Sequence, residues 1–228
     1  NKEISFKNLN LLIIDEEHKF GVRQKEKIRS LKSGINVISL SATPIPRTLN
    51  LSLSKVRDIS LITTPPTGRK SVKTIVSRYS KSLVFEAIQR EFYRDGQVFY
   101  LLNNVSMLEE KKKEISDRFP DKKIAFAHGQ LRPKELSVVM QSFIRKEIDL
   151  LVCTTIIESG IDIENANTLI VEESQNYGLS QLHQIRGRVG RSQREAYAYF
   201  FLNQVKELKN KASERIEALQ ENESLLSG

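Results

Sequence analysis

The sequence predicts an α/β fold in which parallel sheets are covered by helices on both faces. Short runs of apolar residues recur along the chain, and continuous runs of this kind are typical of strands buried on both sides. Between most of these runs lie stretches whose apolar residues have helical spacing. Strands that alternate with helices favour a parallel sheet. The length of 228 residues allows one large domain or two small ones.

The expected elements follow in chain order. Strands are expected at the apolar runs 11–14, 36–40, 59–62, 72–76, 97–102, 123–127, 150–154, 168–172 and 196–202. Helices are expected at 82–94, 108–119, 133–144, from 179 to 185, and over the amphipathic stretch 204–226. Two prolines and a glycine indicate a linker at 65–70. The predicted parts are therefore 1–64, the linker, 71–203, and a helical extension over 204–228.

Composition excludes several classes of protein. The net charge of +8 indicates a polyanionic partner. A single cysteine excludes an intramolecular disulfide framework and a cysteine-rich zinc site. No apolar run approaches the ~18 residues of a membrane span, and the first residues lack the features of a signal peptide, so a cytosolic protein is expected. Because the chain begins with Asn1 and enters an apolar run almost at once, we expect a fragment of a longer protein.

Two acidic residues directly follow the first apolar run. Asp15 and Glu16 would stand at the carboxyl end of a strand, where parallel sheets bind their ligands. In phosphate chemistry one such carboxylate holds Mg²⁺, and the next orients or deprotonates the attacking water. A solvated acidic turn is the alternative, and these residues alone leave both interpretations open.

Hydroxyl side chains follow two other runs. Ser41 and Thr43 come after the run 36–40 and could bond neighbouring carboxylates, although these residues alone favour a plain helix cap beside a proline turn. Thr154 and Thr155 follow Cys153, a position that suits contact with a nucleic-acid phosphate. A capped turn between strand and helix is the alternative there.

Two residues further along offer additional ligand contacts. Gly160 would permit a positive φ or a close approach of the backbone. The carboxylate of Asp162 could accept from a ribose hydroxyl or bind a cation. His18, His128 and His183 are far apart in sequence and form no HExxH pair, so structural histidines are expected and a metal site is not.

Three arginines alternate with two glycines directly after an apolar helical stretch. This segment reads Arg186-Gly187-Arg188-Val189-Gly190-Arg191. Forked guanidinium groups suit phosphate oxygens, and glycines let the backbone come close. An exposed basic loop is the alternative, but glycines so near to arginines favour a shaped site.

The order of these segments resembles a known family. Asp-Glu-x-His, Ser-Ala-Thr, Thr-Thr…Gly-x-Asp and Gln-x-x-Gly-Arg-x-Gly-Arg follow one another as motifs II, III, V and VI do in superfamily 2 helicases and translocases. The stretches 15–25, 42–49, 127–131 and 179–191 resemble the bacterial transcription-repair coupling factor family (Mfd), and the resemblance covers nearly the whole chain. The RecG branch-migration helicases are similar too and share Pro-Ile-Pro-Arg-Thr at 44–48. They more usually have Gln where this chain has Glu17, which separates the two families only modestly.

This resemblance implies a motor of two RecA-like, P-loop NTPase-like lobes, of which the chain holds the C-terminal part of lobe one and all of lobe two. ATP with Mg²⁺ would bind between the lobes and double-stranded DNA across both. Coupling factors are cytoplasmic bacterial motors that push stalled RNA polymerase off a lesion and recruit excision-repair proteins, here through domains outside this chain. No structural metal is implied.

The resemblance also implies roles for single residues. Asp15 would hold Mg²⁺ through water, and Glu16 would be the catalytic base. Arg191, and to a lesser degree Arg188, would reach the γ-phosphate. The remaining transferred positions are Gln184 beside these arginines, Asp162 and Gly160 at the nucleotide, Thr154 and Thr155 at DNA phosphate, Ser41 and Thr43 in coupling hydrolysis to lobe movement, and His18, His128 and Gln130 near the cleft or the DNA path.

One departure limits what the chain can do by itself. The sequence contains no G-x-x-x-x-G-K-[ST] loop to cradle phosphates, so the isolated chain is expected to be inactive as an ATPase. An incomplete lobe one is also expected to self-associate. The alternative functions are a RecG-type DNA helicase, an RNA helicase of the same superfamily and a non-catalytic DNA-binding module. Intact Asp15 and Glu16 argue against the last of these.

Overall fold

A computed structural model of the protein divides into two compact units, Asn1–Leu61 and Ile62–Gly228. Each unit is considered by itself. The structure describes residues 8–15, 20–21, 23, 26, 34–40, 58–60, 62, 71–154 and 163–203. The predicted helix over 204–226 lies outside these residues. No helix within the described ranges is long and apolar enough to cross a membrane.

The first unit contains a pair of parallel strands, β1 (Leu11–Asp15) and β2 (Asn36–Leu40), as predicted. The register pairs Leu11 with Asn36 and Asp15 with Leu40. Because side chains alternate between the two faces of a strand, one face carries apolar side chains that are 47–58% exposed. These are Leu11, Ile13, Ile38 and Leu40. Ile14 on the opposite face is buried.

The run 59–62 was predicted to be a strand, and this prediction is wrong for its described part. Residues 58–60 and 62 have no regular secondary structure, and the side chain of Ile62 is 94% exposed. Ser60 interrupts the apolar run, which leaves too little continuous apolar surface for a strand buried on both faces.

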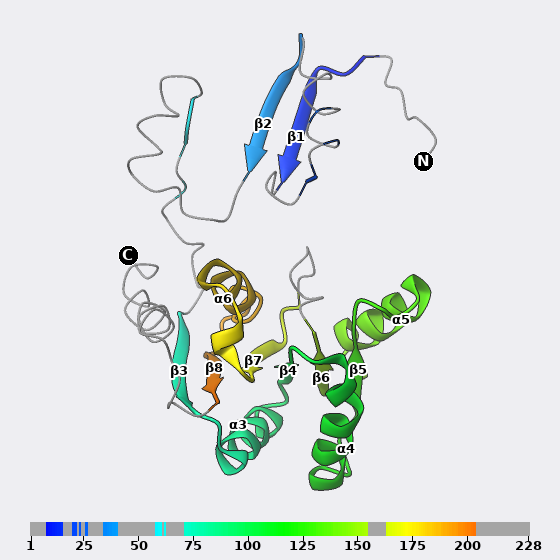
Figure 1. Ribbon diagram of the computed structural model, residues 1–228, viewed down its shortest axis with the longest axis vertical. Coiled ribbons are helices and arrows are strands. Elements are labelled where there is room, and N and C mark those ends of the chain that lie inside the picture. Colours follow the sequence, from blue (N-terminus) through cyan, green and yellow to red (C-terminus); the bar gives the residue numbers. More distant parts are fainter. Residues whose placement is uncertain are drawn as a thin grey trace. The chain divides into compact units, whose positions relative to one another are not determined.

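In its described residues the second unit contains one sheet of six parallel strands (Figure 1). The strands are β3 (Val72–Arg78), β4 (Gln97–Leu101), β5 (Ile124–Ala127), β6 (Leu150–Cys153), β7 (Ala166–Val171) and β8 (Ala196–Leu202). They are arranged in the order β3-β8-β7-β4-β6-β5. The carboxyl ends of all six strands therefore lie at one edge of the sheet, called here the carboxyl edge.

Helices connect these strands close to the predicted positions. They are α3 (Lys81–Tyr93), α4 (Leu108–Arg118), α5 (Pro133–Ile144) and α6 (Leu179–Arg186), with short 3-10 helices η2 (Val105–Met107) and η4 (Ser174–Asn176). Ser80 caps α3 by accepting a hydrogen bond from the backbone N–H of Leu83. Pro133 occupies the first turn of α5, where a missing N–H costs nothing.

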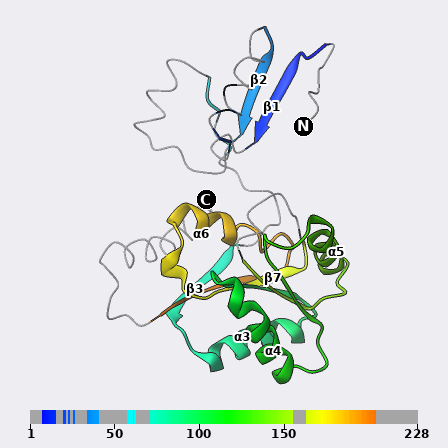
Figure 2. The same cartoon turned by 45° about the vertical axis from the view of Figure 1, so that its right-hand side comes forward.

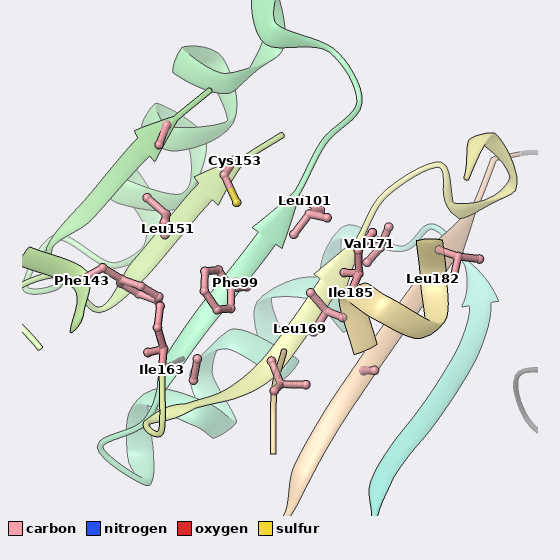
Figure 3. Close-up of a cluster of buried hydrophobic side chains, with 14 of the residues drawn as sticks. Phe99, Leu101, Phe143, Leu151, Cys153, Ile163, Leu169, Val171, Leu182 and Ile185 are labelled. Atoms are coloured by element: carbon pink, nitrogen blue, oxygen red, sulfur yellow. The ribbon is translucent and has the colours of Figure 1, made fainter. Parts of the chain in front are cut away.

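The helices cover both faces of the sheet, as the sequence predicts. Figure 2 shows α3 and α4 on one face and α5 and α6 on the other. Alternate residues of β4 point into the two layers, so that Val98 and Tyr100 pack in the core under α3 and α4. Phe99 and Leu101 pack in the opposite core, which α5 and α6 cover (Figure 3). All four of these β4 side chains are at most 1% exposed, and burial of Val98, Phe99 and Leu101 contributes roughly 1.5–3 kcal/mol each.

Candidate functional site

Helix α6 positions the arginine segment, residues 186–191. Its N-terminus is capped by the Gln181 side chain, which accepts a hydrogen bond from the backbone N–H of Gly178 at 3.0 Å. Leu182 and Ile185 anchor the helix in the core (Figure 3), and Val189 continues this buried stripe beyond the helix end. The arginine segment is thus held on a rigid support and does not belong to a free loop.

Gly190 fixes the path of the arginine segment. Its φ is +73°, in the left-handed region that favours glycine. A Cβ at this position would lie 2.9 Å from both the Ala196 Cβ and the Val72 Cγ2 atoms. The backbone at Gly190 therefore lies close to the first residues of β8 and β3. Gly187 has an ordinary helical φ of −66° and ends α6.

Arg186 has a different environment from the two arginines that follow it. Its side chain is buried, and it donates hydrogen bonds to Thr74 Oγ1 at 3.4 Å and to His183 Nδ1 at 3.2 Å. Burial, together with the positive charge of Arg186, lowers the pKa of His183, which keeps Nδ1 available as an acceptor. Arg186 therefore fastens α6 to β3. The segment as a whole was expected to bind phosphate, and the spacing of its three arginines carries no signal that separates Arg186 from the others.

Arg188 and Arg191 are accessible from solvent to different degrees. Arg188 is partly exposed and Arg191 is exposed, while the Arg191 Nε donates to the carbonyl of Gly187 at 3.3 Å. This contact orients the guanidinium group without burying it. Gln184, one turn before Arg188, is also partly exposed. An exposed, backbone-braced guanidinium group is suited to binding phosphate oxygens.

A second group of predicted residues lies at the carboxyl edge. Strand register pairs Ala127 of β5 with Cys153 of β6, so the residues that follow, His128 and Thr154, stand beside each other there. The backbone N–H of Thr154 donates to the Ala127 carbonyl at 3.3 Å. The His128 ring stacks on Phe126 with 6.1 Å between ring centroids. This edge is where parallel sheets commonly bind ligands.

The arginine segment lies at the amino ends of the strands, whereas the pair His128–Thr154 lies at the carboxyl edge. Gly190 abuts the first residues of β3 and β8, whereas Thr154 follows the last residue of β6. The eight residues of α6 span roughly 12 Å, which carries the chain from one edge of the sheet toward the other. Two chemically distinct surfaces therefore belong to the second unit.

In the first unit, Asp15 is the last residue of β1, and its side chain is exposed. A hard carboxylate oxygen at the end of a parallel strand fits Mg²⁺, held directly or through water. Within the described ranges, no group of three or more His, Cys, Asp or Glu side chains is placed to hold a metal ion. The other predicted positions, Glu16, His18, Ser41, Thr43, Thr155, Gly160 and Asp162, lie outside the described residues.

Sequence reasoning missed a polar cluster at the end of β7. Glu172 is buried and accepts a hydrogen bond from the Tyr100 hydroxyl. It also forms an ion pair with Lys111, whose Nζ lies 2.9 Å from its Oε1. Lys111 also pairs with Glu114 at 2.9 Å. Although burial opposes the charge of Lys111, its bonds to Glu172 and Glu114 raise its pKa. A signal was available, because Glu172 and Glu173 follow this apolar strand much as Asp15 and Glu16 follow the apolar run 11–14.

Comparison with known proteins connects this geometry to a family. Residues 81–193 match the helicase conserved C-terminal domain. The transcription-repair-coupling factor of Staphylococcus haemolyticus is 52% identical over 227 residues, which are 100% of this chain and 19% of that protein. The chain thus spans about a fifth of the length of this curated relative.

Solved structures agree on the fold. RecG bound to a three-way DNA junction superimposes with a TM-score of 0.75 and 35% identity, over 96% of this chain and 29% of that one. Saccharomyces cerevisiae Dbp5 bound to RNA and ADP BeF3 superimposes with a TM-score of 0.66 over 96% of this chain and 57% of that one. At 15% identity, the second likeness shows the fold alone. The six-stranded parallel sheet with its covering helices matches the C-terminal RecA-like domains of helicases. Residues 81–193 thus form a helicase conserved C-terminal domain, and the chain is similar to the transcription-repair-coupling factors over its whole length.

Proposed function

We propose that the chain is part of the motor of an ATP-dependent double-stranded DNA translocase that couples transcription to nucleotide-excision repair by displacing stalled RNA polymerase. The observation that carries this proposal is the arginine segment, in which Gly190 and the buried Arg186 brace the backbone while Arg191 stays exposed. The identity of 52% to a transcription-repair-coupling factor supports it. RNA polymerase and excision-repair proteins would bind domains outside this chain.

Hydrolysis would use residues from both units. Asp15 would hold Mg²⁺ through water, and Glu16 would take a proton from the attacking water. Bound Mg²⁺ neutralises charge on the phosphate oxygens. Arg191 and Arg188 would bind the oxygens of the transferred phosphoryl group, where a guanidinium stabilises the charge of the transition state. Gln184 would lie beside them, and Gly160 and Asp162 would contact the nucleotide.

DNA would be held through phosphate contacts at the carboxyl edge of the second unit. Thr154, Thr155 and His128 would supply hydrogen-bonding groups there, and Ser41 and Thr43 would couple hydrolysis to movement of the units. Phosphate contacts carry no sequence information, and their strength falls steeply with salt. Binding should therefore be independent of DNA sequence and weaken at high salt, which fluorescence anisotropy with two unrelated duplexes measures.

The organisation of the chain completes the proposal. Residues 1–64 would be the C-terminal part of lobe one, 65–70 a linker, 71–203 lobe two and 204–228 the start of a helical extension. The protein would act in the bacterial cytoplasm. Because the phosphate-cradling loop is not in this chain, the 228 residues alone should hydrolyse no ATP.

The test uses a full-length protein that contains this chain. Arg191→Ala should leave ATP binding intact and lower DNA-stimulated turnover by about 10³-fold or more, and Arg188→Ala should act in the same direction but less strongly. Arg145→Ala, which changes an exposed arginine after α5, is the matched control. If the Arg191 and Arg188 variants turn ATP over as fast as the control, the proposed hydrolytic role is wrong.

A RecG-type branch-migration helicase is the second candidate, favoured by the TM-score of 0.75 to RecG on a three-way junction. The two functions differ in substrate. A coupling factor should release stalled RNA polymerase from DNA and leave a three-way junction largely unprocessed, whereas a RecG-type enzyme should do the reverse. Both reactions with the same preparation of full-length protein decide between them.

A further inference from the structure

The turn between β7 and α6 is hydrogen-bonded to the residues at which the chain leaves β8. This turn, residues 172–176, is called here the β7–α6 turn. Glu173 within it has a φ of +49°, a left-handed conformation that is uncommon for a residue with a side chain. Such conformations persist where the surrounding contacts hold them, and they gather at functional sites.

Three hydrogen bonds join this turn to residues 201–203, and a fourth lies within the turn; the Glu173 carboxylate accepts two of the four. Its Oε1 accepts from Asn203 Nδ2 at 2.6 Å, and its Oε2 accepts from Asn176 Nδ2 at 3.1 Å. Gln175 Oε1 accepts from the backbone N–H of Asn203 at 3.4 Å. The buried Ser174 hydroxyl donates to the Phe201 carbonyl at 3.1 Å. The turn therefore holds the last residues of β8 through both side chain and backbone.

The same turn is anchored on its other side. Glu172 is tied to β4 and α4 through Tyr100 and Lys111, in the interior of the second unit. After the turn, Gly178 leads into α6, which carries the arginine segment at its far end. The turn is thus the short connection between the core, the arginine helix and the exit of β8.

We propose that Glu173 is a positioning residue that fixes the direction in which the chain leaves the second unit at Asn203, so that movement of α6 is passed to the chain beyond it. This proposal deepens the proposed function, because its mechanical consequence requires an ATP-driven translocase. In this role Glu173 needs no contact with ATP or DNA. It acts through Asn203 and through the path of the turn.

The left-handed φ allows the carboxylate to be removed without adding backbone strain. Glu173→Gly keeps a backbone that favours positive φ and loses both hydrogen bonds of the carboxylate. Glu173→Gln keeps an oxygen acceptor of similar reach. Glu110→Gln, which changes an exposed glutamate on α4, is the matched control. If the backbone conformation alone mattered, Glu173→Gly would behave as the unaltered protein does.

Hydrogen exchange in the full-length protein directly tests how firmly the β7–α6 turn holds residues 201–203. Glu173→Gly should speed exchange of the amides at 201–203 by about tenfold, the effect expected from losing a hydrogen bond to a charged group, while the unfolding midpoint changes little. Glu173→Gln should restore most of the protection, and Glu110→Gln should change nothing. Unchanged exchange at 201–203 in Glu173→Gly would overturn the proposal.

The second measurement compares ATP turnover with movement along DNA. Glu173→Gly should keep DNA-stimulated ATPase within about twofold, since Glu173 is outside the hydrolytic residues, but should lower triplex-strand displacement per ATP by about fivefold or more. Glu173→Gln should recover it. Equal losses of ATPase and displacement, or no loss of either, would contradict the positioning role. If the unaltered protein itself displaces no strand while exchange at 201–203 responds as expected, the proposed function is wrong. The positioning of Asn203 by Glu173 is then still supported.

Discussion

Lys111 Nζ lies 2.9 Å from Glu172 Oε1, and each of the two side chains is only 11% exposed. The pair joins α4 to the end of β7, and the Tyr100 hydroxyl donates to the same carboxylate. Burial, reinforced by the neighbouring negative charge of Glu172, raises the Tyr100 pKa well above its ordinary value. Tyr100 thus remains a neutral donor over the working range of pH.

Removing one member of this pair should destabilise the second unit strongly. Lys111→Met leaves Glu172 buried without its cation, which should lower the free energy of unfolding by about 3–5 kcal/mol. Urea denaturation monitored by circular dichroism measures this. The double variant Lys111→Met/Glu172→Met should lose less than the sum of the single variants, because no uncompensated charge remains. Strictly additive losses would show that the pair does not act as a unit.

Gly190 and Gly187 should respond differently to the same substitution. Gly190→Ala places a Cβ 2.9 Å from Val72 and Ala196 at a positive φ, and it should lower the free energy of unfolding by about 2–4 kcal/mol. Gly187→Ala meets only backbone carbonyls at 3.4 Å with an ordinary φ and should change it by less than about 1 kcal/mol. Thermal unfolding of both variants provides the comparison, and similar losses would refute the account of Gly190.

His183 should make stability fall as the pH drops below the ordinary histidine pKa of about 6.5. Its pKa is lowered in the folded protein by burial and by Arg186, so the unfolded chain takes up a proton more readily. The stabilisation is therefore present above the ordinary pKa near 6.5 and is lost as the pH falls through the lowered folded pKa. His183→Gln should flatten urea-unfolding free energies measured across this range. A variant as pH-dependent as the original chain would exclude this histidine as the source.

The exposed face of the β1–β2 pair should drive self-association of the 228-residue chain. Leu11, Ile13, Ile38 and Leu40 lie on that face with about half of each side chain exposed. Ile13→Lys should shift the chain toward monomer, because a charged side chain opposes burial of the face against another copy. Val138→Lys, at an exposed apolar position on α5, is the control. Multi-angle light scattering at several concentrations measures the shift, and a strict monomer before substitution would be evidence against it.

Local sequence predicted the elements well and their arrangement less well. The buried runs of β4 and β6 are continuous apolar segments, and such segments can be recognised without knowing their neighbours. That β7 lies between β8 and β4 depends on pairing between distant segments, which leaves no local trace in the sequence. The run 59–62 is largely apolar, yet its described residues form no strand. Apolar composition alone does not provide a strand with a pairing partner.

The candidate site, too, could be predicted from the sequence only in part. The motif order indicated the arginines as a group, yet only packing distinguishes the buried Arg186, bonded to Thr74, from the exposed Arg191. Glu172 could have been found from the acidic end of its strand. Glu173 could not, because its left-handed backbone and its bond to Asn203 depend on the meeting of two strand ends.

The pairing of β3 with β8 has a mechanical consequence. Among the described residues of the second unit these are the first and last strands, they run parallel, and seven successive pairs join them from Val72↔Ala196 to Arg78↔Leu202. The chain enters at one end of this ladder and leaves at the other, so tension between the two connections pulls the strands in opposite directions along their length. Such a load is a shear, shared by all the rungs at once, whereas peeling would break them one by one. Force passing through the chain would thus meet the sheet along the direction in which it is hardest to separate.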